Sequence, residues 1–419
     1  MINKTIQTSK CKFFCRHCNS EQAMPFVDLG FAPPSNAYLT KENLYKPEIY
    51  YPLRVNVCKL CWLVQTEDFA NSNELFTDDY AYFSSTSISW LEHSKKFANN
   101  IIERLNLTSQ SFVIEIGSND GYLLQNFLKL SINCIGIEPT IQTSKVAKLI
   151  GITVVEDFFT DSLASKLINY VGKADLIVGN NVYAHVPDIN NFTQGIKKLL
   201  KSEGVITLEF PHILNIIEFS QFDTIYHEHY SYLSLHAVIK IFNSFGLKIF
   251  DVEKISTHGG SLRVYGCHKE SANIILASVD RILSEELLKN ITNEKGYLDF
   301  QSKSNKIKNE LLYFLLKIKK NSNTVAAYGA AAKGNTLLNY AGIKPDLLPV
   351  VYDLAPSKQG KFMPGSHIPI EHPDTLMSTP PDYVIVLPWN LEVEISNQLS
   401  EIKKKGSKIV SFIPEIRYL

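Results

Sequence analysis

The chain has 419 residues, of which 45% are hydrophobic, and it carries 42 basic and 42 acidic side chains. This length predicts two or three domains, and the balanced charge argues against a dedicated nucleic-acid-binding protein, which usually has a basic surplus. No apolar run reaches the roughly 20 residues of a membrane span, and the first residues lack the apolar core of a signal peptide. We therefore expect a cytoplasmic protein with no membrane partner, whose cysteines are metal ligands or buried thiols rather than disulfides.

Two C-x-x-C pairs lie within the first 70 residues, a region with little helical periodicity. The four cysteines are Cys15, Cys18, Cys58 and Cys61. Four thiolates suit tetrahedral Zn²⁺, with residues 19–57 forming an inserted loop between the pairs. Four unrelated buried thiols, or a redox pair, are the alternatives, and Cys11 and His17 are weaker candidate ligands. We expect a structural zinc site, because four protein ligands leave no position for a substrate.

Apolar strand-like segments alternate with helical stretches from about residue 100 onwards. The first set is 111–117, 134–139, 152–157, 175–182 and 205–211, closed by an antiparallel pair at 247–255 and 260–267. Residues 272–321 have a helical composition. A second set follows at 324–329, 347–353, 382–388 and 408–414. Such alternation predicts two doubly wound α/β units joined by a helical link.

A glycine turn follows the first strand, in the segment "VIEIGSNDGYLL". Gly117 and Gly121 let the backbone and a helix N-terminus approach a ligand closely. The absence of Gly-x-Gly-x-x-Gly disfavours a nicotinamide domain. Glu138 ends the next strand, where an acid can accept hydrogen bonds from ribose hydroxyls. After the third strand, Asp157 is placed to reach an adenine amine and Phe158 to cover the adenine ring. In this order the features resemble the S-adenosylmethionine (SAM) fold of class I methyltransferases.

That resemblance predicts the donor-binding residues. They are Glu115, Gly117, Asn119, Asp120, Gly121, Glu138, Asp157, Phe158, Asn180 and Asn181. Asn180, Asn181 and His185 follow the fourth strand, at the sheet edge where ligands bind in such folds.

A polar run, "FDTIYHEHYSYLSL", follows the fifth strand at the same edge. It has no third cluster of metal ligands, so zinc is a poor interpretation, and a hydrogen-bonded loop is the bland alternative. Histidine titrates near neutral pH and can act as a base. A methyltransferase that acts on carbon must make a carbanion, which a neighbouring ketone allows if its enolate oxygen is stabilised.

The two cysteine pairs and the motifs "EIGSNDGYLL", "YHEHYSYLS", "HGGSLRVY" and "YGAAAKGN" resemble the three-domain nucleotide-sugar C-methyltransferases, over nearly the whole chain. The resemblance implies SAM-dependent methylation of C3 of an NDP-4-keto-6-deoxyhexose. It implies that His229 is the base. The other active-site residues that it implies are Tyr226, Glu228, His185 and Tyr80. Spacing alone does not choose between His227 and His229.

The segment "TVAAYGAAAKGN" is a second strand, small-residue turn and helix, suited to a diphosphate. The family resemblance assigns this site to the nucleotide of the sugar substrate. The substrate-binding residues that we predict are His258, Ser261, Arg263, Tyr328, Gly329, Ala330, Lys333 and Asp353. For Arg263 the alternative is a surface arginine on a strand.

The expected organisation is α/β with a zinc-binding module at 1–70, a SAM-binding methyltransferase domain at 71–267, and a Rossmann-like nucleotide-sugar domain with its helical link at 268–419. The rivals are a sugar O- or N-methyltransferase on the same scaffold and a non-catalytic zinc-dependent interaction protein. The nucleotide, the sugar configuration and the oligomeric state stay open, with a monomer as one option.

Overall fold

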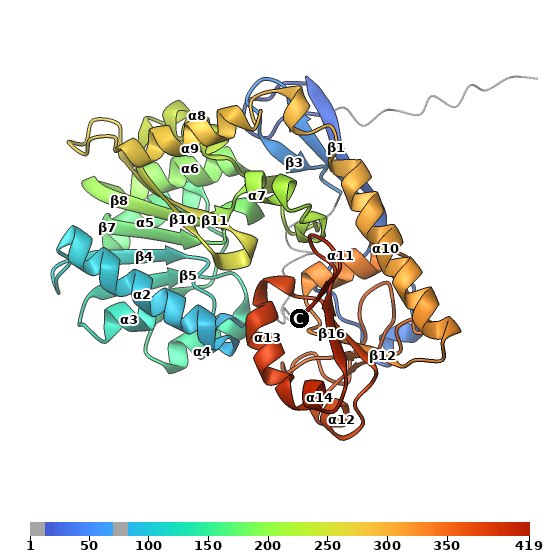
Figure 1. Cartoon of the computed structure of the whole chain (residues 1–419). Coiled ribbons are helices and arrows are strands. Elements are labelled where there is room, and N and C mark those ends of the chain that lie inside the picture. The colour runs from blue at the N-terminus through green and yellow to red at the C-terminus, as the bar shows by residue number, and fades with distance from the viewer. Residues whose placement is uncertain (1–12, 70–82) are drawn as a thin grey trace, which may run out of the picture.

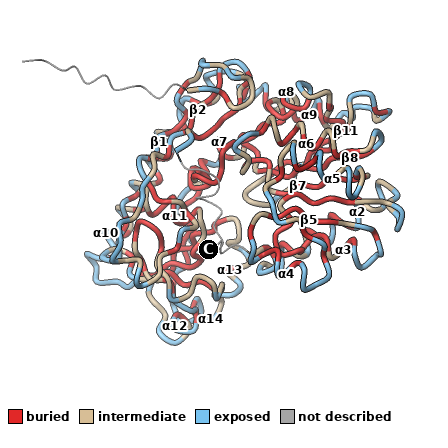
Figure 2. Tube along the Cα trace, turned by 180° about the vertical axis from the view of Figure 1, so that it is seen from behind, coloured by how far each residue is buried: buried red, intermediate tan, exposed pale blue. Residues whose placement is uncertain are grey.

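The computed structural model describes residues 13–69 and 83–419 (Figure 1). Within these residues the chain forms sheets of four, seven and six strands. Figure 2 shows that strands at the centre of the seven-stranded sheet are mostly buried, whereas the helices outside it expose one side. In the described part of the chain, no helix is both long enough and apolar enough to cross a membrane.

The N-terminal sheet takes one strand from the middle of the chain. Its order is β1 (Ala23–Ala32), β2 (Tyr51–Cys58), β3 (Val64–Thr66) and β9 (Ser231–Tyr232). Val64 pairs with Tyr232 in antiparallel register. Because β9 directly follows the "YHEH" run, the zinc-binding module anchors one end of that run. The sequence did not predict this pairing.

The seven-stranded sheet has the expected doubly wound form. Its order is β10 (Leu247–Ile255), β11 (Ser261–His268), β8 (Leu200–Pro211), β7 (Ala174–Asn180), β4 (Phe112–Ile116), β5 (Asn133–Ile137) and β6 (Thr153–Val155). All pairs are parallel except those of β11 with β8 and β10. The closing antiparallel pair is therefore confirmed, and the sheet has the class I methyltransferase fold.

Helices cover both faces of this sheet (Figure 1). One face packs against α2 (Ile88–Leu105), α3 (Leu124–Leu128) and α4 (Ile141–Leu149). The other packs against α5 (Asp161–Val171), α6 (Ile189–Leu199), α8 (Leu235–Ser244) and α9 (Ala277–Leu288). Because strands buried on both faces have no solvent side, they are nearly continuous runs of Val, Ile and Leu.

The C-terminal sheet has the order β14 (Ile370–Glu371), β13 (Val351–Tyr352), β12 (Val325–Tyr328), β15 (Tyr383–Val386), β16 (Lys408–Ser411) and β17 (Arg417–Tyr418). Its helices are α11 (Ala332–Tyr340), α12 (Pro373–Ser378), α13 (Glu392–Gln398) and α14 (Ser400–Lys404). The parallel strands β12–β16 confirm the second α/β unit.

The predicted helical link is not a single connector. Helix α9 packs on α8 and β10, whereas α10 (Phe300–Lys320) packs on β1. Helix α7 (Ile213–Glu218) and α11 contribute to one hydrophobic core that also includes strands of the N-terminal sheet. The three parts therefore share buried surface, and the boundaries at residues 70 and 267 stay predictions.

Candidate active site

The four cysteines of the C-x-x-C pairs come together at one end of the N-terminal sheet. All four Sγ atoms lie within 4.8 Å of one another, with 3.4 Å between Cys15 and Cys61 and 3.5 Å between Cys18 and Cys58. A tetrahedral Zn²⁺ with Zn–S bonds of about 2.3 Å places its sulfur ligands a little under 4 Å apart. The separations of 3.4 Å and 3.5 Å are close to this value, and the cluster as a whole is compact enough for zinc. His17 is hydrogen-bonded to Asn190 instead. Cys11 lies outside the described residues.

We expect one zinc ion per chain, and none of the four cysteines lines the cavity described below. Cys58→Ser should therefore lower the melting temperature and the zinc content more than it lowers turnover per folded molecule. Elemental analysis and thermal unfolding measure both effects. Cys134→Ser, which changes a cysteine outside the cluster, is the matched control. Carefully purified protein without stoichiometric metal would contradict the assignment.

A cavity of about 530 Å³ lies between the carboxyl ends of the central strands and the C-terminal sheet. Its walls come from all three parts of the chain, including Asn36 of the N-terminal module, Glu138 and His229 of the central part, and Lys333 of α11. A volume of this order suits a small-molecule ligand. The cavity occupies the sheet edge that the sequence predicted.

The glycine turn after β4 forms one wall. Gly117, Asn119 and Gly121 have φ of +69°, +49° and +81°, conformations that favour glycine or asparagine. A Cβ added to Gly117 would lie 2.4 Å from Cγ2 of Val182, so only glycine fits this close approach. Gly117 and Asn119 line the cavity, whereas Asp120 and Gly121 stand behind it.

The side chains of the turn hold a neighbouring segment. Oδ1 of Asn119 accepts the backbone N–H of Ser84 at 2.9 Å, and Oδ2 of Asp120 accepts that of Ser85 at 3.0 Å. Ser84 and Trp90 then form part of the cavity wall. Asp120 therefore positions the wall from behind.

Glu138 lies where β5 ends and lines the cavity. Its carboxylate accepts the backbone N–H groups of Asn119 and Thr140, both at 2.9 Å. Burial raises the pKa of Glu138, while these hydrogen bonds oppose the rise. The hydroxyl of Thr140 also donates to Oε1. A carboxylate has four lone-pair positions, so one position, on Oε2, remains for a ribose hydroxyl.

We expect Glu138→Ala to weaken SAM binding by about tenfold or more, because a charge-assisted hydrogen bond to the ribose is lost. Calorimetry measures the affinity. Glu156→Ala, at a nearby exposed carboxylate outside the cavity wall, is the control. Unchanged affinity in Glu138→Ala would remove this residue from the donor site.

Buried polar groups line the same wall. The amide groups of Asn180 and Asn181 are buried and have no hydrogen-bond partner among the described residues, and both residues line the cavity. Such groups are costly unless a ligand or water bonds to them. Together with Asp157 and Phe158, which also line it, they fit a nucleoside-containing donor.

Glu115 does not line the cavity. It is fully buried in the middle of β4. Burial, reinforced by the nearby Asp120 and Glu138, raises its pKa well above the usual value. Glu115 therefore stands beneath the glycine turn rather than at the cavity surface.

His229 and Tyr226 line the cavity, and His185 lies beside them. Nδ1 of His229 is 2.7 Å from the carbonyl oxygen of Thr224. Because a carbonyl only accepts, Nδ1 carries the proton and Nε2 has the lone pair. The hydroxyl of Tyr226 donates to Nε2 at 2.8 Å. Burial, with His185 nearby, lowers the pKa of His229 well below its usual value, so the imidazole is neutral and can accept a proton.

The other two members of "YHEH" point elsewhere. Nε2 of His227 faces the carbonyl oxygen of Pro52 in β2 at 3.3 Å, and Oε1 of Glu228 accepts the amide of Asn36 at 3.1 Å. Neither residue lines the cavity. They attach the run to the N-terminal module, and Asn36 in turn reaches the cavity wall. Tyr80 lies outside the described residues.

The C-terminal part contributes the Lys333 cation to the cavity. His258, in the loop between β10 and β11, lies in the same wall and is neutral, because burial lowers its pKa to about 3. Both residues were expected to line the cavity, whereas Tyr328, Gly329, Ala330, Ser261 and Asp353, also expected, do not. Asp353 instead accepts the backbone N–H of Ala330 at 2.7 Å, which shapes the turn before α11.

Lys358 was missed by the sequence reasoning, although it lines the cavity. Its Nζ donates to the carbonyl oxygen of Ala330 at 2.8 Å and lies 3.5 Å from Asp353. The available signal was a lysine shortly after the acid that ends β13.

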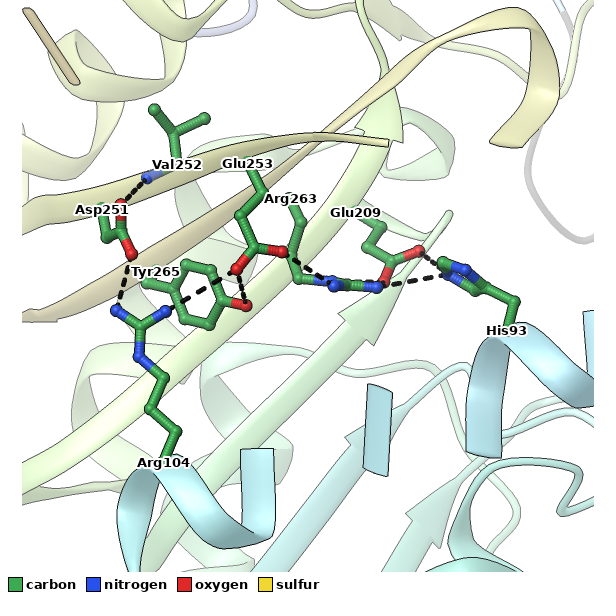
Figure 3. Close-up of polar contacts among 8 residues, drawn as sticks. All are labelled: His93, Arg104, Glu209, Asp251, Val252, Glu253, Arg263 and Tyr265. Atoms are coloured by element: carbon green, nitrogen blue, oxygen red, sulfur yellow. Dashed lines mark hydrogen bonds and ion pairs between the residues drawn. The ribbon is translucent and has the colours of Figure 1, made fainter. Parts of the chain in front are cut away.

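Arg263 is not at the cavity surface, which gives no support to a diphosphate-binding role. Figure 3 shows its guanidinium between two carboxylates. Nε is 2.7 Å from Glu209, and Nη1 is 3.0 Å from Glu253. Burial alone would raise the pKa of Glu209, but His93 and Arg263 together lower it. The alternative of a surface arginine is also wrong, because Arg263 is only 6% exposed.

This buried network supports a cavity wall that the sequence did not reveal. His93 is 2.9 Å from Glu209, and its ring stacks on Trp90 at 4.9 Å and 18°. Trp90 lines the cavity and contacts His258 edge-on at 5.1 Å. The Glu209 carboxylate therefore fixes Trp90 through His93.

Comparison with known proteins agrees with this three-part site. Residues 15–76 match the model of a zinc binding domain, residues 90–252 that of a methyltransferase domain, and residues 256–414 that of a C-methyltransferase C-terminal domain. The methyltransferase part resembles the 1,6-didemethyltoxoflavin-N1-methyltransferase of Burkholderia thailandensis, with 14% identity, a TM-score of 0.37, and coverage of 50% of this chain and 96% of that one. It also resembles the magnesium protoporphyrin IX methyltransferase of Synechocystis, with 12% identity, a TM-score of 0.35, and coverage of 48% and 100%.

A relative matches almost from end to end. The C-methyltransferase NovU of Streptomyces niveus is 31% identical over 405 residues, which cover 97% of this chain and 96% of NovU. The cysteine cluster, the SAM-type sheet and the C-terminal α/β part occur here in the same single chain. The chain therefore belongs to the family of three-domain, zinc-binding, SAM-dependent C-methyltransferases.

Proposed function

We propose that the protein methylates C3 of an NDP-4-keto-6-deoxyhexose in the biosynthesis of branched deoxysugars. The observation that carries the proposal is the neutral, buried His229, whose Nε2 lies in the same cavity as the SAM-type wall and the lysines of the C-terminal part. An NDP-sugar has a nucleotide at one end and the reacting carbon at the other. A cavity that combines the lysines of the C-terminal part with His229 suits such a substrate.

The proposed donor site comprises Gly117, Glu138, Asp157 and the amides of Asn180 and Asn181. SAM supplies an electrophilic methyl group when bound. Glu138 orients the donor through its ribose, and the unpaired amides bind its polar groups. The turn at Gly117 leaves room for the donor beside the sheet edge.

The proposed base is His229. Thr224 holds the tautomer in which Nε2 accepts, and the hydroxyl of Tyr226 lies against that nitrogen. Removal of the C3 proton leaves an enolate whose charge lies on the C4 oxygen. His185, with its ring centroid 4.5 Å from that of His229, is a neutral neighbour, because burial lowers its pKa to about 4. The walls hold the enolate carbon toward the donor, which favours in-line attack.

A carbon nucleophile explains the site better than an oxygen or nitrogen nucleophile. Hydroxyl and amine acceptors have lone pairs, so methylating them needs little base, whereas a C–H acceptor needs a neutral base that lies against its proton and is shielded from water. His229 is 6% exposed.

The experiment is incubation of the enzyme with a panel of NDP-4-keto-6-deoxyhexoses in D₂O, with and without SAM. We expect one member of the panel to exchange its C3 proton without SAM, by NMR, and to gain one methyl on carbon with SAM, by mass spectrometry. Methylation without any exchange would favour the O- or N-methyltransferase. Failure to bind SAM would favour the non-catalytic interaction protein.

A further inference from the structure

Lys333 is an unusually placed cation in the cavity wall. It is only 8% exposed, although it lies in the first turn of α11. Its Nζ lies 4.4 Å from the ring centroid of Trp389 and donates to Oδ1 of Asn390 at 3.1 Å. An ammonium has three donors, so capacity remains for a ligand in the cavity.

The surroundings of Lys333 connect it to the methyltransferase part. The indole N–H of Trp389 donates to Oδ2 of Asp223 at 2.7 Å, and Asp223 lies two residues before the "IYHEH" run. Asp223 is fully buried and is the charge that favours the protonated form of Lys333. Gly259 packs so tightly on Trp389 that a Cβ there would lie 2.2 Å from Cη2. The position of Lys333 is therefore set by residues next to the proposed base.

Lys358 has a different set of partners. Its contacts are the carbonyl of Ala330, the carboxylate of Asp353 and the ring of Tyr38. These groups surround the turn before α11, where a helix N-terminus and a cation suit a diphosphate. The two lysines thus have different partners in the wall of one cavity.

The electrostatic environment also connects Lys333 with the proposed base. The positive charge of Lys333 helps to lower the pKa of His229 and of His258, although burial is the main cause for both. Burial lowers the pKa of Lys333 to about 8 while Asp223 opposes this shift, so the amine is mainly protonated at pH 7. Lys333 is thus a cation that acts on the proposed base.

We propose that Lys333 is a catalytic residue that stabilises the enolate oxygen of the substrate, and that Lys358 rather than Lys333 binds the diphosphate. The inference rests on the proposed function. In the step, the C3–H bond breaks and its proton goes to His229, while the electron pair forms the C3–C4 double bond and places the negative charge on O4. Lys333 donates a hydrogen bond to O4. When C3 attacks the methyl group, the C4 carbonyl forms again and the bonding pair of the donor's S–CH₃ bond stays on sulfur.

The test measures C3 proton exchange in D₂O without SAM, on the ketosugar that the wild-type enzyme exchanges, at saturating substrate. We expect Lys333→Met to slow exchange by about 10²–10³-fold, the cost of removing one oxyanion donor. We expect its affinity for the nucleoside diphosphate alone to change less than about threefold. Lys333→Arg, which keeps the charge, should recover at least about tenfold over Lys333→Met.

Lys358→Met is the matched comparison, with an expected loss of about tenfold in affinity for the nucleoside diphosphate. Lys333→Gln, which can still bond to Asn390, gives the same readout if Lys333→Met does not fold, as judged by thermal unfolding and SAM affinity. Wild-type exchange in Lys333→Met or Lys333→Gln would overturn the inference. The inference would also be overturned if Lys333→Met lost as much affinity for the nucleoside diphosphate as Lys358→Met does and still exchanged the C3 proton normally at saturating substrate. A wild-type enzyme that exchanges no ketosugar would overturn the proposed function itself and this inference with it.

Discussion

His229→Asn is expected to abolish methyl transfer and C3 proton exchange, with a loss of about 10²–10⁴-fold in each rate. Asparagine has a similar size but no group that takes a proton near neutral pH. In the wild-type chain, Thr224 fixes Nε2 of His229 as the accepting nitrogen, which holds a hydrogen bond from Tyr226, and both His229 and Tyr226 line the cavity. NMR in D₂O follows the exchange, and mass spectrometry follows the transfer.

His227→Asn is the control for this prediction, because His227 has the same side chain two residues away but faces Pro52 in the N-terminal sheet. It should keep most of the exchange rate at saturating substrate. If His229→Asn turns over normally while His227→Asn is inactive, the base is His227. If both variants keep full methyl transfer, the histidine-base mechanism fails and Tyr226 becomes the next candidate.

Arg263→Met is expected to lower the free energy of unfolding by about 3–5 kcal/mol, the usual cost of removing one partner of a buried ion pair. Glu209 is fully buried, and among the residues that the structure describes its carboxylate would retain His93 as its side-chain partner (Figure 3). The packing of the guanidinium on Phe97, at 4.6 Å from the ring centroid, would change as well. Urea unfolding measures the loss.

Arg104→Met is the matched control in the same network. Arg104 pairs with Asp251, but its side chain is 31% exposed, so water screens the pair and the expected loss is less than half that of Arg263→Met. An equal loss in the two variants would show that burial of the Glu209 pair contributes little.

The sequence alone predicts those features of this protein that depend on residues close together in the chain. The C-x-x-C pairs predicted the zinc cluster, because each pair already places two thiolates on one turn. The strands of both α/β units except β14 and β17 were predicted from their apolar runs, because a strand buried on both faces needs apolar residues throughout. The glycine turn predicted a ligand wall at the end of β4, since φ above zero at Gly117 is a local requirement.

Tertiary structure decided the direction in which polar side chains point. His227 and His229 are equivalent in spacing, and the pairing of β9 with β3 places only His229 in the cavity. The sequence places Arg263 on a strand but does not say which group its side chain contacts. The side chain faces Glu209 because β8 pairs with β11 and puts Glu209 opposite Arg263. Lys358 reaches the cavity only because the turn before α11 passes near it. These contacts join residues far apart in the chain, so no local pattern encodes them and the packing of three parts around one cavity creates them.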